Sequence, residues 1–173
     1  PRMLSSLEAA AARGCKIIAI NPLRERGLER FAHPQKPLAL LGRSQKIATQ
    51  YVQVKINGDV ALLKGIMKAV FDLDEQSTDS LVDYEFINTH TQGFDAFKRS
   101  LDQVDWEDII QASGCSETEI RQVAYTYAHA KASIICWAMG LTQHKNGVGN
   151  IQEVVNLLLL KGNIGRQGAG ACP

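Results

Sequence analysis

Apolar residues recur along the chain with two different periods, and the N-terminal segment shows both. Residues 3–13 are strong helix formers, and Gly14 follows where a helix that ends in a left-handed residue is expected. Residues 16–20 are a short run rich in β-branched side chains that stops at Asn21–Pro22. Because proline cannot continue a strand, the pattern predicts a helix and then a buried strand.

The next part of the chain changes character twice. Residues 23–50 contain prolines and glycines among charged residues with little periodicity, which predicts an irregular excursion. Residues 51–56 alternate with period two and predict a short strand. Asn57–Gly58 then predict a turn, and Asp59 is expected to cap a helix over 60–73. The apolar face of that helix consists of Leu62, Leu63, Ile66, Met67 and Val70.

Residues 74–131 predict a series of helices that cover the sheet and take no part in chemistry. The clearest start signal is the capping box Ser116–Glu119, which opens a helix over 117–131. Ser80 is expected to cap a helix over 81–90. Two short helices between them are marked by apolar residues, namely Phe94, Phe97 and Leu101 in one and Trp106, Ile109 and Ile110 in the other.

The C-terminal part combines a strand, a helix and a glycine-rich segment. Residues 133–138 are almost continuously apolar, which is typical of a strand buried on both faces. Met139–Gly140 predict a turn, and a polar stretch over 142–150 leads into a helix over 150–161. The chain closes with a run in which side chains cannot set the backbone geometry, formed by Gly162, Gly165, Gly168 and Gly170.

This order of elements predicts an α/β fold. Helices that follow strands through short connections imply parallel pairing, so we expect a three-layer αβα arrangement with a mostly parallel, Rossmann-like sheet. At 173 residues a single domain over 1–173 is expected. The chain opens with proline and stops after a glycine-rich turn, so we expect an incomplete domain, truncated at both ends.

Composition narrows the class of protein and leaves its function open. The apolar fraction of 45% and charged fraction of 21% are those of an ordinary globular protein. A net charge of +1 argues against nucleic-acid binding. The basic stretch of Arg24, Arg26 and Arg30 is interrupted by glutamates, so a solvated turn is favoured over an anion site. No run is long and apolar enough to span a membrane and the sequence shows no signal peptide, so we expect a cytoplasmic protein.

Four cysteines lie far apart without a C-x-x-C pair, which excludes a zinc ribbon or an iron–sulfur run within this sequence. We expect them to be small buried residues in a reducing compartment, with Cys172 less enclosed than Cys15, Cys115 and Cys136. The four histidines show no ligand spacing, so no metal site is expected here.

Three polar turns follow the predicted strands, at the edge where an open parallel sheet binds ligands. They are residues 21–24, residues 57–59 and residues 139–144. Taken singly, each is explained by a strand stop, a helix cap or a tight turn. Together they supply side chains for ribose hydroxyls or a purine edge, and backbone N–H groups for phosphate. With no catalytic triad, P-loop or G-x-G-x-x-G fingerprint, the residues alone predict a nucleotide-binding α/β domain.

Three motifs resemble the molybdopterin oxidoreductase family, the group that includes dimethyl sulfoxide reductase, periplasmic nitrate reductase and the molybdenum formate dehydrogenases. Residues 17–23 resemble its strand followed by Asp/Asn-Pro, and residues 57–59 its Gly-x-Asp turn. The most specific signal is residues 139–144 followed by the Gly-Asn-Ile-Gly and Gly-Ala-Gly motifs within residues 157–170. The segments IAINPLRERGLERF and FINTHTQGF are similar to the branch of the formate dehydrogenase alpha subunits.

The resemblance covers essentially the whole chain and implies that it grips the nucleotide end of a molybdopterin guanine dinucleotide. In the complete protein, two of these groups would hold molybdenum. By position, the cofactor-binding residues fall into three groups: Asn21, Pro22 and Arg24 at the guanosine, Gly58 and Asp59 at nucleotide hydroxyls or base, and Met139, Gly140, Gln143 and His144 along the pterin–phosphate path.

The sequence also departs from the family pattern. Asn21 stands where many members have Asp, and Leu23–Arg24 replaces a Pro-Arg pair. The molybdenum ligand of many relatives has no counterpart here, and neither do the cysteines of an iron–sulfur cluster, which would lie outside this chain. We therefore expect no catalysis from this chain alone.

The leading hypothesis is part of an oxidoreductase in which the cofactor exchanges electrons and an oxygen atom or hydride with a small substrate such as formate. The alternative is a non-catalytic nucleotide-binding or scaffold module of the same fold. A nicotinamide-dependent dehydrogenase is disfavoured by the missing fingerprint. An apolar strand left at an exposed edge also predicts that the chain made alone associates with itself.

Overall fold

The computed structural model describes residues 2–31 and 44–173. The chain forms two compact units, Pro1–Val54 and Lys55–Pro173. Part of the excursion predicted over 23–50 lies outside the described residues. That the two units act as one cofactor-binding domain stays a prediction.

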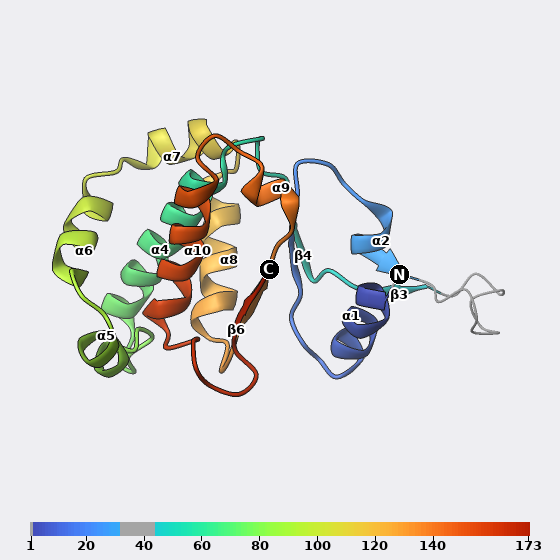
Figure 1. Ribbon diagram of the computed structural model, residues 1–173, viewed down its shortest axis with the longest axis horizontal. Helices are drawn as coiled ribbons and strands as arrows, with labels where there is room; N and C mark the ends of the chain where they lie inside the picture. The colour runs from blue at the N-terminus through green and yellow to red at the C-terminus, as the bar shows by residue number, and fades with distance from the viewer. Residues whose placement is uncertain (1, 32–43) are drawn as a thin grey trace. The chain divides into compact units, whose positions relative to one another are not determined.

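The first unit contains the predicted helix and strand. Helix α1 spans Arg2–Ala12 and is followed by Gly14, whose φ of +87° is the left-handed geometry expected after a helix end. Strand β1 (Ile18–Ile20) pairs in parallel with β4 (Gln50–Val52), with Ala19 opposite Tyr51. Figure 1 shows both strands and α1 in blue to teal. The parallel pairing predicted for these segments is confirmed.

The prediction of an irregular stretch over 23–50 is wrong for its two ends. A single-turn helix α2 (Arg26–Glu29) leads into β2 (Arg30–Phe31), which pairs antiparallel with β3 (Gln45–Lys46). Elements of two to four residues are too short to produce a recognisable hydrophobic period. Strand β4 is likewise shorter than the predicted 51–56, since the N–H of Lys55 donates to the carbonyl of Ser113 instead of extending the ladder.

The second unit is built around helix α4 (Asp59–Gln76), which packs against α7 (Trp106–Ser113), α8 (Glu117–Ala128) and α10 (Gly147–Leu160). Its predicted apolar face is buried, and Ile66, Met67 and Val70 are at most 1% exposed. Gly65 allows the close approach of neighbouring helices, because a Cβ there would lie 2.8 Å from Cγ2 of Ile109. The core of this unit is therefore between helices, and the predicted covering of a sheet is replaced by helix-on-helix packing.

The helices that follow are α5 (Tyr84–His90), α6 (Phe94–Asp102), α7 (Trp106–Ser113) and α8 (Glu117–Ala128). The capping box of Ser116 and Glu119 at the start of α8 is confirmed, with both reciprocal bonds formed. The prediction that Ser80 caps α5 is wrong: the carboxylate of Asp83 accepts the N–H of Phe86, and Ser80 donates to the carbonyl of Val82. Ser80 instead forms a local turn ahead of the helix.

The C-terminal segment forms β5 (Ile134–Cys136), the single-turn helix α9 (Met139–Thr142), α10 (Gly147–Leu160) and β6 (Gly170–Cys172). Strand β5 is not buried on both faces as predicted, because among the described residues it pairs only with β6, and Ile134 is 57% exposed. The predicted turn at Met139–Gly140 is the start of α9, and α10 begins three residues before the predicted 150. The hydrophobic pattern did not predict β6, because glycine and alanine make up two of its three residues.

The strands pair as three two-stranded ladders, of which β1–β4 and β5–β6 are parallel. The α/β class is therefore confirmed, while the described strands do not join into one continuous sheet. The expectation of buried cysteines holds only for Cys115; Cys15, Cys136 and Cys172 are exposed, as anticipated for the last. Among the described helices, none has the length and apolar character needed to cross a membrane.

Candidate functional site

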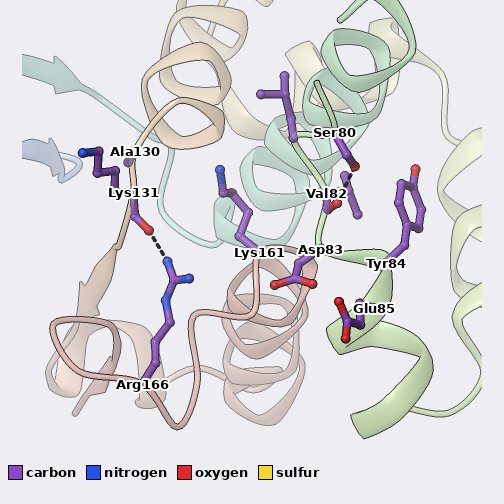
Figure 2. A pocket seen from close by; sticks show the side chains of 10 residues that line it. Ser80, Val82, Asp83, Tyr84, Glu85, Ala130, Lys131, Lys161 and Arg166 are labelled. Carbon is purple, nitrogen blue, oxygen red and sulfur yellow. Dashed lines mark hydrogen bonds between the residues drawn. The ribbon is translucent and has the colours of Figure 1, made fainter. Parts of the chain in front are cut away.

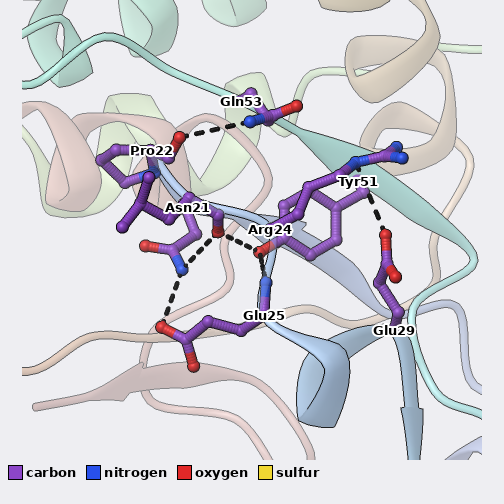
Figure 3. A network of polar contacts seen from close by, with 8 residues as sticks. Asn21, Pro22, Arg24, Glu25, Glu29, Tyr51 and Gln53 are labelled. Atoms are coloured by element: carbon purple, nitrogen blue, oxygen red, sulfur yellow. Dashed lines mark hydrogen bonds and ion pairs between the residues drawn. The ribbon is translucent and has the colours of Figure 1, made fainter.

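The turn after β1 is held by a network of polar contacts within the first unit (Figure 3). The N–H of Asn21 donates to the carbonyl of Val52 and so continues the parallel ladder past the strand. The side-chain Nδ2 of Asn21 donates to the carbonyl of Leu23 at 2.8 Å and to Oε1 of Glu25 at 3.0 Å. The donor end of this amide is thus already engaged in shaping the turn.

Tyr51 braces the same turn from β4. Its hydroxyl donates to the carbonyl of Leu23 at 2.7 Å and accepts the N–H of Glu25 at 3.1 Å. From the same side, Nε2 of Gln53 donates to the carbonyl of Pro22 at 3.3 Å. These bonds hold the backbone of residues 22–25 without using any charged side-chain group.

Arg24 lies over the ring of Tyr51, with its guanidinium carbon 5.5 Å from the ring centre, and its Nε is 3.5 Å from Oε1 of Glu29. The Arg24 side chain is 61% exposed, so this ion pair is weak and screened by solvent. The stacking orients the guanidinium while leaving its edge open to an anion. The mixed-charge surface turn expected from the sequence is therefore compatible with an anion contact at Arg24.

In the second unit, Gly58 is required by packing. Asn57 adopts a positive φ of 67° to form the turn, and the N–H of Gly58 donates to the carbonyl of Lys55. A Cβ on Gly58 would lie 2.8 Å from the carbonyl oxygen of Ala112. Gly58, and not Asp59, occupies the N-cap position of α4, so the prediction that Asp59 caps the helix is wrong. Asp59 is the first helical residue, where its charge is favoured by the helix dipole.

The carboxyl group of Asp59 is half-buried, and burial raises its pKa above the ordinary value. A hydrogen bond with its own backbone and the electrostatic influence of His144 both lower the pKa, without cancelling the effect of burial. His144 follows α9, so this interaction brings together two of the three turns predicted to bind the nucleotide. A half-buried carboxylate at the start of a helix is suited to accept hydrogen bonds from hydroxyl or N–H groups.

Helix α9 presents the third predicted group to solvent. Met139, Gly140 and Gln143 are all exposed, and Nε2 of Gln143 lies 3.5 Å from Sδ of Met139. The N–H of Gln143 donates to the carbonyl of Met139, which closes the single turn. Open space surrounds the position of a Cβ at Gly140, so a ligand can approach the backbone there.

Sequence reasoning missed Asn150, which anchors this turn. Asn150 is fully buried, and its Nδ2 donates to the carbonyl of Leu141 at 2.8 Å. Its Oδ1 accepts from the amide of Asn146 at 3.4 Å. The only signal in the sequence was a polar residue at the predicted start of a helix, which is ordinarily a cap.

The start of α10 lies directly after the α9 turn. Asn146 is its N-cap residue but makes no side-chain capping bond, and the first helical residues include Gly147 and Gly149. A Cβ at Gly147 would lie 2.3 Å from the carbonyl oxygen of Thr142, which explains that glycine, whereas open space surrounds Gly149. A long helix thus begins without a side-chain cap, and its N-terminal end carries a partial positive charge.

Asn163 of the Gly-Asn-Ile-Gly motif was also missed, and its role is structural. It is fully buried; its Nδ2 donates to the hydroxyl of Tyr127 at 3.1 Å, and its Oδ1 accepts from the N–H of Ser133 and from Arg166. The hydroxyl of Tyr127 in turn donates to the carbonyl of Leu157 at 2.6 Å. Burial raises the pKa of Tyr127, so this hydroxyl stays protonated. The network ties α8 to the end of α10 and the start of β5.

A separate surface depression of about 530 Å³ contains none of the predicted cofactor residues (Figure 2). Its walls include Lys161 and Arg166, which donate to the carbonyls of Ala128 and Lys131, respectively. Both cations therefore satisfy backbone groups at and just after the C-terminal end of α8, where positive charge is favoured. With carboxylates such as Asp83 and Glu85 on the facing wall, this depression is a poor match for an anionic nucleotide.

The structure therefore places Gly58, Asp59, Met139, Gly140, Gln143 and His144 in the second unit, with Asp59 and His144 interacting. Asn21, Pro22 and Arg24 form a separate braced turn in the first unit. Across residues 2–31 and 44–173, no cluster of three or more histidine, cysteine or acidic side chains is arranged to hold a metal ion.

No profile of a known protein family matches the chain. Protein YdeP of Escherichia coli is 52% identical over 178 residues, which cover 100% of this chain and 24% of that protein. An uncharacterized oxidoreductase of Mycobacterium tuberculosis is 44% identical over 173 residues, covering 100% of this chain and 22% of that protein. The F420-dependent formate dehydrogenase 1 subunit alpha of Methanococcus maripaludis is 31% identical over 173 residues, again 100% of this chain and 22% of that protein.

Among solved structures, acetylene hydratase from Pelobacter acetylenicus superimposes with a TM-score of 0.77 at 24% identity, over 96% of this chain and 20% of that one. This likeness supports the fold. The chain spans about a quarter of the length of the curated relatives it matches. The sequence motifs and the relatives agree: over its whole length the chain is similar to part of a group of oxidoreductases that includes an alpha subunit of formate dehydrogenase.

Proposed function

We propose that this chain holds the nucleotide arm of a bis(molybdopterin guanine dinucleotide) cofactor within a larger molybdenum-dependent oxidoreductase. The observation that carries the proposal is the arrangement of the α9 turn at the start of α10, which has no side-chain cap: the fully buried Asn150 bonds to the carbonyl of Leu141 and fixes the turn there. The electrostatic influence of His144 on Asp59 relates this Met-Gly-Leu-Thr-Gln-His segment to the Gly-Asp turn at the start of α4. Both are motifs by which the chain resembles the molybdopterin oxidoreductase family.

The residues of the second unit fit an anionic nucleotide. The carboxylate of Asp59 can accept hydrogen bonds from ribose hydroxyls or from the N–H groups of guanine. Gly140 and Gly149 are surrounded by open space, and α10 begins without a side-chain cap, so backbone N–H groups are available to phosphate oxygens. Asn150 fixes the α9 turn relative to α10, which holds these groups in register.

The braced turn of the first unit suits the base end of the same kind of ligand. Arg24 is stacked on Tyr51 and keeps its charged edge accessible, as cation recognition of a phosphate or a purine acceptor requires. The Nδ2 of Asn21 is engaged by Leu23 and Glu25, which leaves the amide oxygen as the group of this side chain that can accept from a base. We assign these two side chains to nucleotide recognition.

When bound, the molybdenum centre of this cofactor would supply the exchange of electrons with a small substrate. The role of this chain is to position the cofactor. It binds the nucleotide and orients the pterin arm past Met139 and Gln143, while the described residues supply no metal ligand. A substrate such as formate is proposed by analogy with the relative named as a formate dehydrogenase.

The test uses the full-length protein purified from cells that make the cofactor. Molybdenum and tungsten are measured by elemental mass spectrometry, and GMP is measured after acid release. About two GMP per metal is expected for the wild type. Asp59→Asn and Gln143→Ala should each lower both contents together, because the cofactor is lost as a unit.

Matched controls come from the same unit. Asp95 also lies in the first turn of a helix, and Gln122 is an exposed glutamine on α8. Asp95→Asn and Gln122→Ala should retain wild-type metal and GMP. If the folded wild type contains neither metal nor GMP, the chain is a scaffold module with the same fold. If all four variants keep full cofactor, the assigned residues are wrong.

A further inference from the structure

Two cysteines far apart in the sequence are register partners in the β5–β6 ladder. Cys136 is the last residue of β5 and lies opposite Cys172, the last residue of β6. Because the two strands are parallel, side chains at paired positions project from the same face. Both residues are exposed, so the pair is open to a reagent in solution.

The backbone around the pair holds the two strands together. The N–H of Trp137 donates to the carbonyl of Cys172 at 3.1 Å, and the N–H of Gly170 donates to the carbonyl of Ser133 at 3.0 Å. Neighbouring strands lie about 4.8 Å apart, which is within the range of about 4.4–6.8 Å between Cα atoms that a disulfide spans. The two thiols therefore meet the distance requirement for a bond without separation of the strands.

The thiol of Cys172 also acts directly on the thiol of Cys136, through its charge and a side-chain hydrogen bond. Partial burial raises the pKa of the Cys136 thiol, and the adjacent Cys172 raises it further. The other two cysteines have different surroundings: Cys115 is 2% exposed and its thiol points to the carbonyl of Ser113, while Cys15 belongs to the first unit. Cys115 and Cys15 thus serve as internal references.

We propose that Cys136 and Cys172 form a dithiol site that a small-molecule disulfide, such as oxidised glutathione, closes into a disulfide bond between β5 and β6. One cysteine, as its thiolate, attacks a sulfur of oxidised glutathione and releases one glutathione thiolate, leaving a mixed disulfide. The other cysteine, as its thiolate, then attacks the protein sulfur of that mixed disulfide and releases the second glutathione. Two protein thiols are oxidised, one glutathione disulfide is reduced to two thiols, and the two protons pass to the solvent or to the released thiolates.

The position of the bond links it to the cofactor-binding segment. Met139 begins α9 three residues after Cys136, and the glycine-rich segment 162–170 leads directly into β6. A disulfide bond between Cys136 and Cys172 would link the end of this glycine-rich segment to β5, the strand that precedes α9. This consequence rests on the proposed function, but formation of the bond does not.

The test is a thiol map of the full-length protein. The protein is equilibrated with oxidised and reduced glutathione in varied ratios, quenched with a maleimide, digested without reduction and analysed by mass spectrometry. We expect a cross-linked peptide pair containing Cys136 and Cys172, lighter by two hydrogen atoms than the separate peptides. The rate of its formation should rise with pH, since the Cys136 thiol must first ionise.

Variants that lack one cysteine distinguish formation of the disulfide bond from separate reactions of two independent thiols with glutathione. Cys136→Ser and Cys172→Ser should each leave one cysteine that carries a stable glutathione adduct, while Cys15→Ser should form the cross-link as the wild type does. Stable glutathione adducts on both residues of the wild type, or complete alkylation of both at every ratio, would overturn the proposal. Metal and GMP contents measured on the same samples report on cofactor binding separately, so the two proposals can fail independently.

Discussion

Asp59 at the start of α4 and His144 just after α9 interact electrostatically, although they are far apart in the sequence. Burial of the Asp59 carboxyl raises its pKa, and the histidine only partly offsets that effect. The ionised carboxylate at neutral pH therefore lowers the stability of the folded protein. A residue that a fold retains at such a cost is a candidate for function.

Replacing Asp59 with Asn should raise the thermal unfolding midpoint of the cofactor-free protein at neutral pH. Burial raises the pKa of the folded carboxyl above its ordinary value of 3.8, so the favourable contribution of the protonated group is fully present below pH 3.8 and is lost as the pH rises through the folded pKa. Asn keeps the shape and removes the buried charge. Calorimetry should show the advantage of the variant at pH about 7 shrinking toward pH about 4.

Asp95→Asn is the control for Asp59→Asn, and its unfolding midpoint should change little over the same pH range. A less stable Asp59→Asn protein at neutral pH would mean that the helix dipole and His144 outweigh burial. The same variant lowers cofactor content under the proposed function, so opposite effects on stability and loading would identify Asp59 as a binding residue.

Asn150→Leu should detach α9 from α10. The substitution leaves the carbonyl of Leu141 without its partner at 2.8 Å, which should cost about 1–3 kcal/mol in the free energy of unfolding. Cofactor content should fall more than stability alone explains, because the α9 turn loses its fixed position. Denaturant titration and GMP release on the same preparation check both effects.

Asn156→Leu provides the comparison on the same helix. Its amide bonds to Oε2 of Glu153 one turn earlier, a local contact on α10. We expect a change below about 1 kcal/mol and full cofactor loading. Equal loss of cofactor in both variants would show that Asn150 acts on the helix as a whole and not on α9.

The long periodic elements could be predicted from the sequence, and the short ones could not. The buried face of α4 and the capping box of Ser116 are set by residues close together in the chain, so local patterns are sufficient. Strand β6 has no apolar period, and it is a strand only because Gly170–Cys172 meets β5. Asp83 replaced Ser80 as the cap of α5 because the neighbouring loop engages Ser80 elsewhere.

The same division holds for the candidate site. The three polar turns were visible as sequence motifs, but the support beneath them depends on distant pairs. Tyr51 braces the turn after β1, and Asn150 secures α9. In the sequence, a tyrosine in a strand and an asparagine near a helix start are both common. Their supporting roles can be identified only from the folded structure.

Gly65→Ala should destabilise the second unit. A Cβ at this position would lie 2.8 Å from Cγ2 of Ile109 and 3.1 Å from Cγ2 of Ile120, and both isoleucines are fully enclosed and cannot move aside. Overpacking of this kind costs about 1–3 kcal/mol, which exceeds the gain of about 0.5–1 kcal/mol from replacing a helical glycine. Chemical denaturation should show a lower midpoint.

Gly149→Ala tests the same helix propensity without the steric conflict. Open space surrounds Gly149, so the alanine should leave stability unchanged or raise it. If both variants are equally stable, the packing of α4 against α7 and α8 tolerates a methyl group and the steric argument fails.

The 173-residue chain expressed alone should self-associate. Strand β5 leaves Ile134 57% exposed, and an accessible apolar strand promotes pairing with another copy. Sedimentation velocity should show oligomers that increase with concentration. Ile134→Lys should reduce them, whereas Ile110→Lys, on the exposed side of α7, should not. If the unmutated 173-residue chain is a monomer at every concentration, the prediction is wrong.

Tyr84→Phe should weaken the loop between α4 and α5, and its effect should depend on pH. The hydroxyl of Tyr84 donates to Oδ2 of Asp74 at 2.8 Å, while Oδ1 of Asp74 accepts the N–H groups of Leu81 and Val82. Burial and then the bond to Asp74 raise the pKa of Tyr84 from 10.0 to about 12. Because the side chain is partly exposed, loss of the bond should cost about 1 kcal/mol at neutral pH.

The protonated hydroxyl stabilises the fold fully below pH 10.0, and this contribution is lost as the pH rises through about 12. The stability difference between wild type and Tyr84→Phe should therefore be constant from neutral pH to about 10 and then shrink, when followed by denaturant titration at each pH. Tyr125→Phe is the control, since this exposed tyrosine lies on α8 away from Asp74. A difference that persists unchanged through pH 12 would show that Tyr84 acts through its ring, which packs edge-on against Phe94, and not through its hydroxyl.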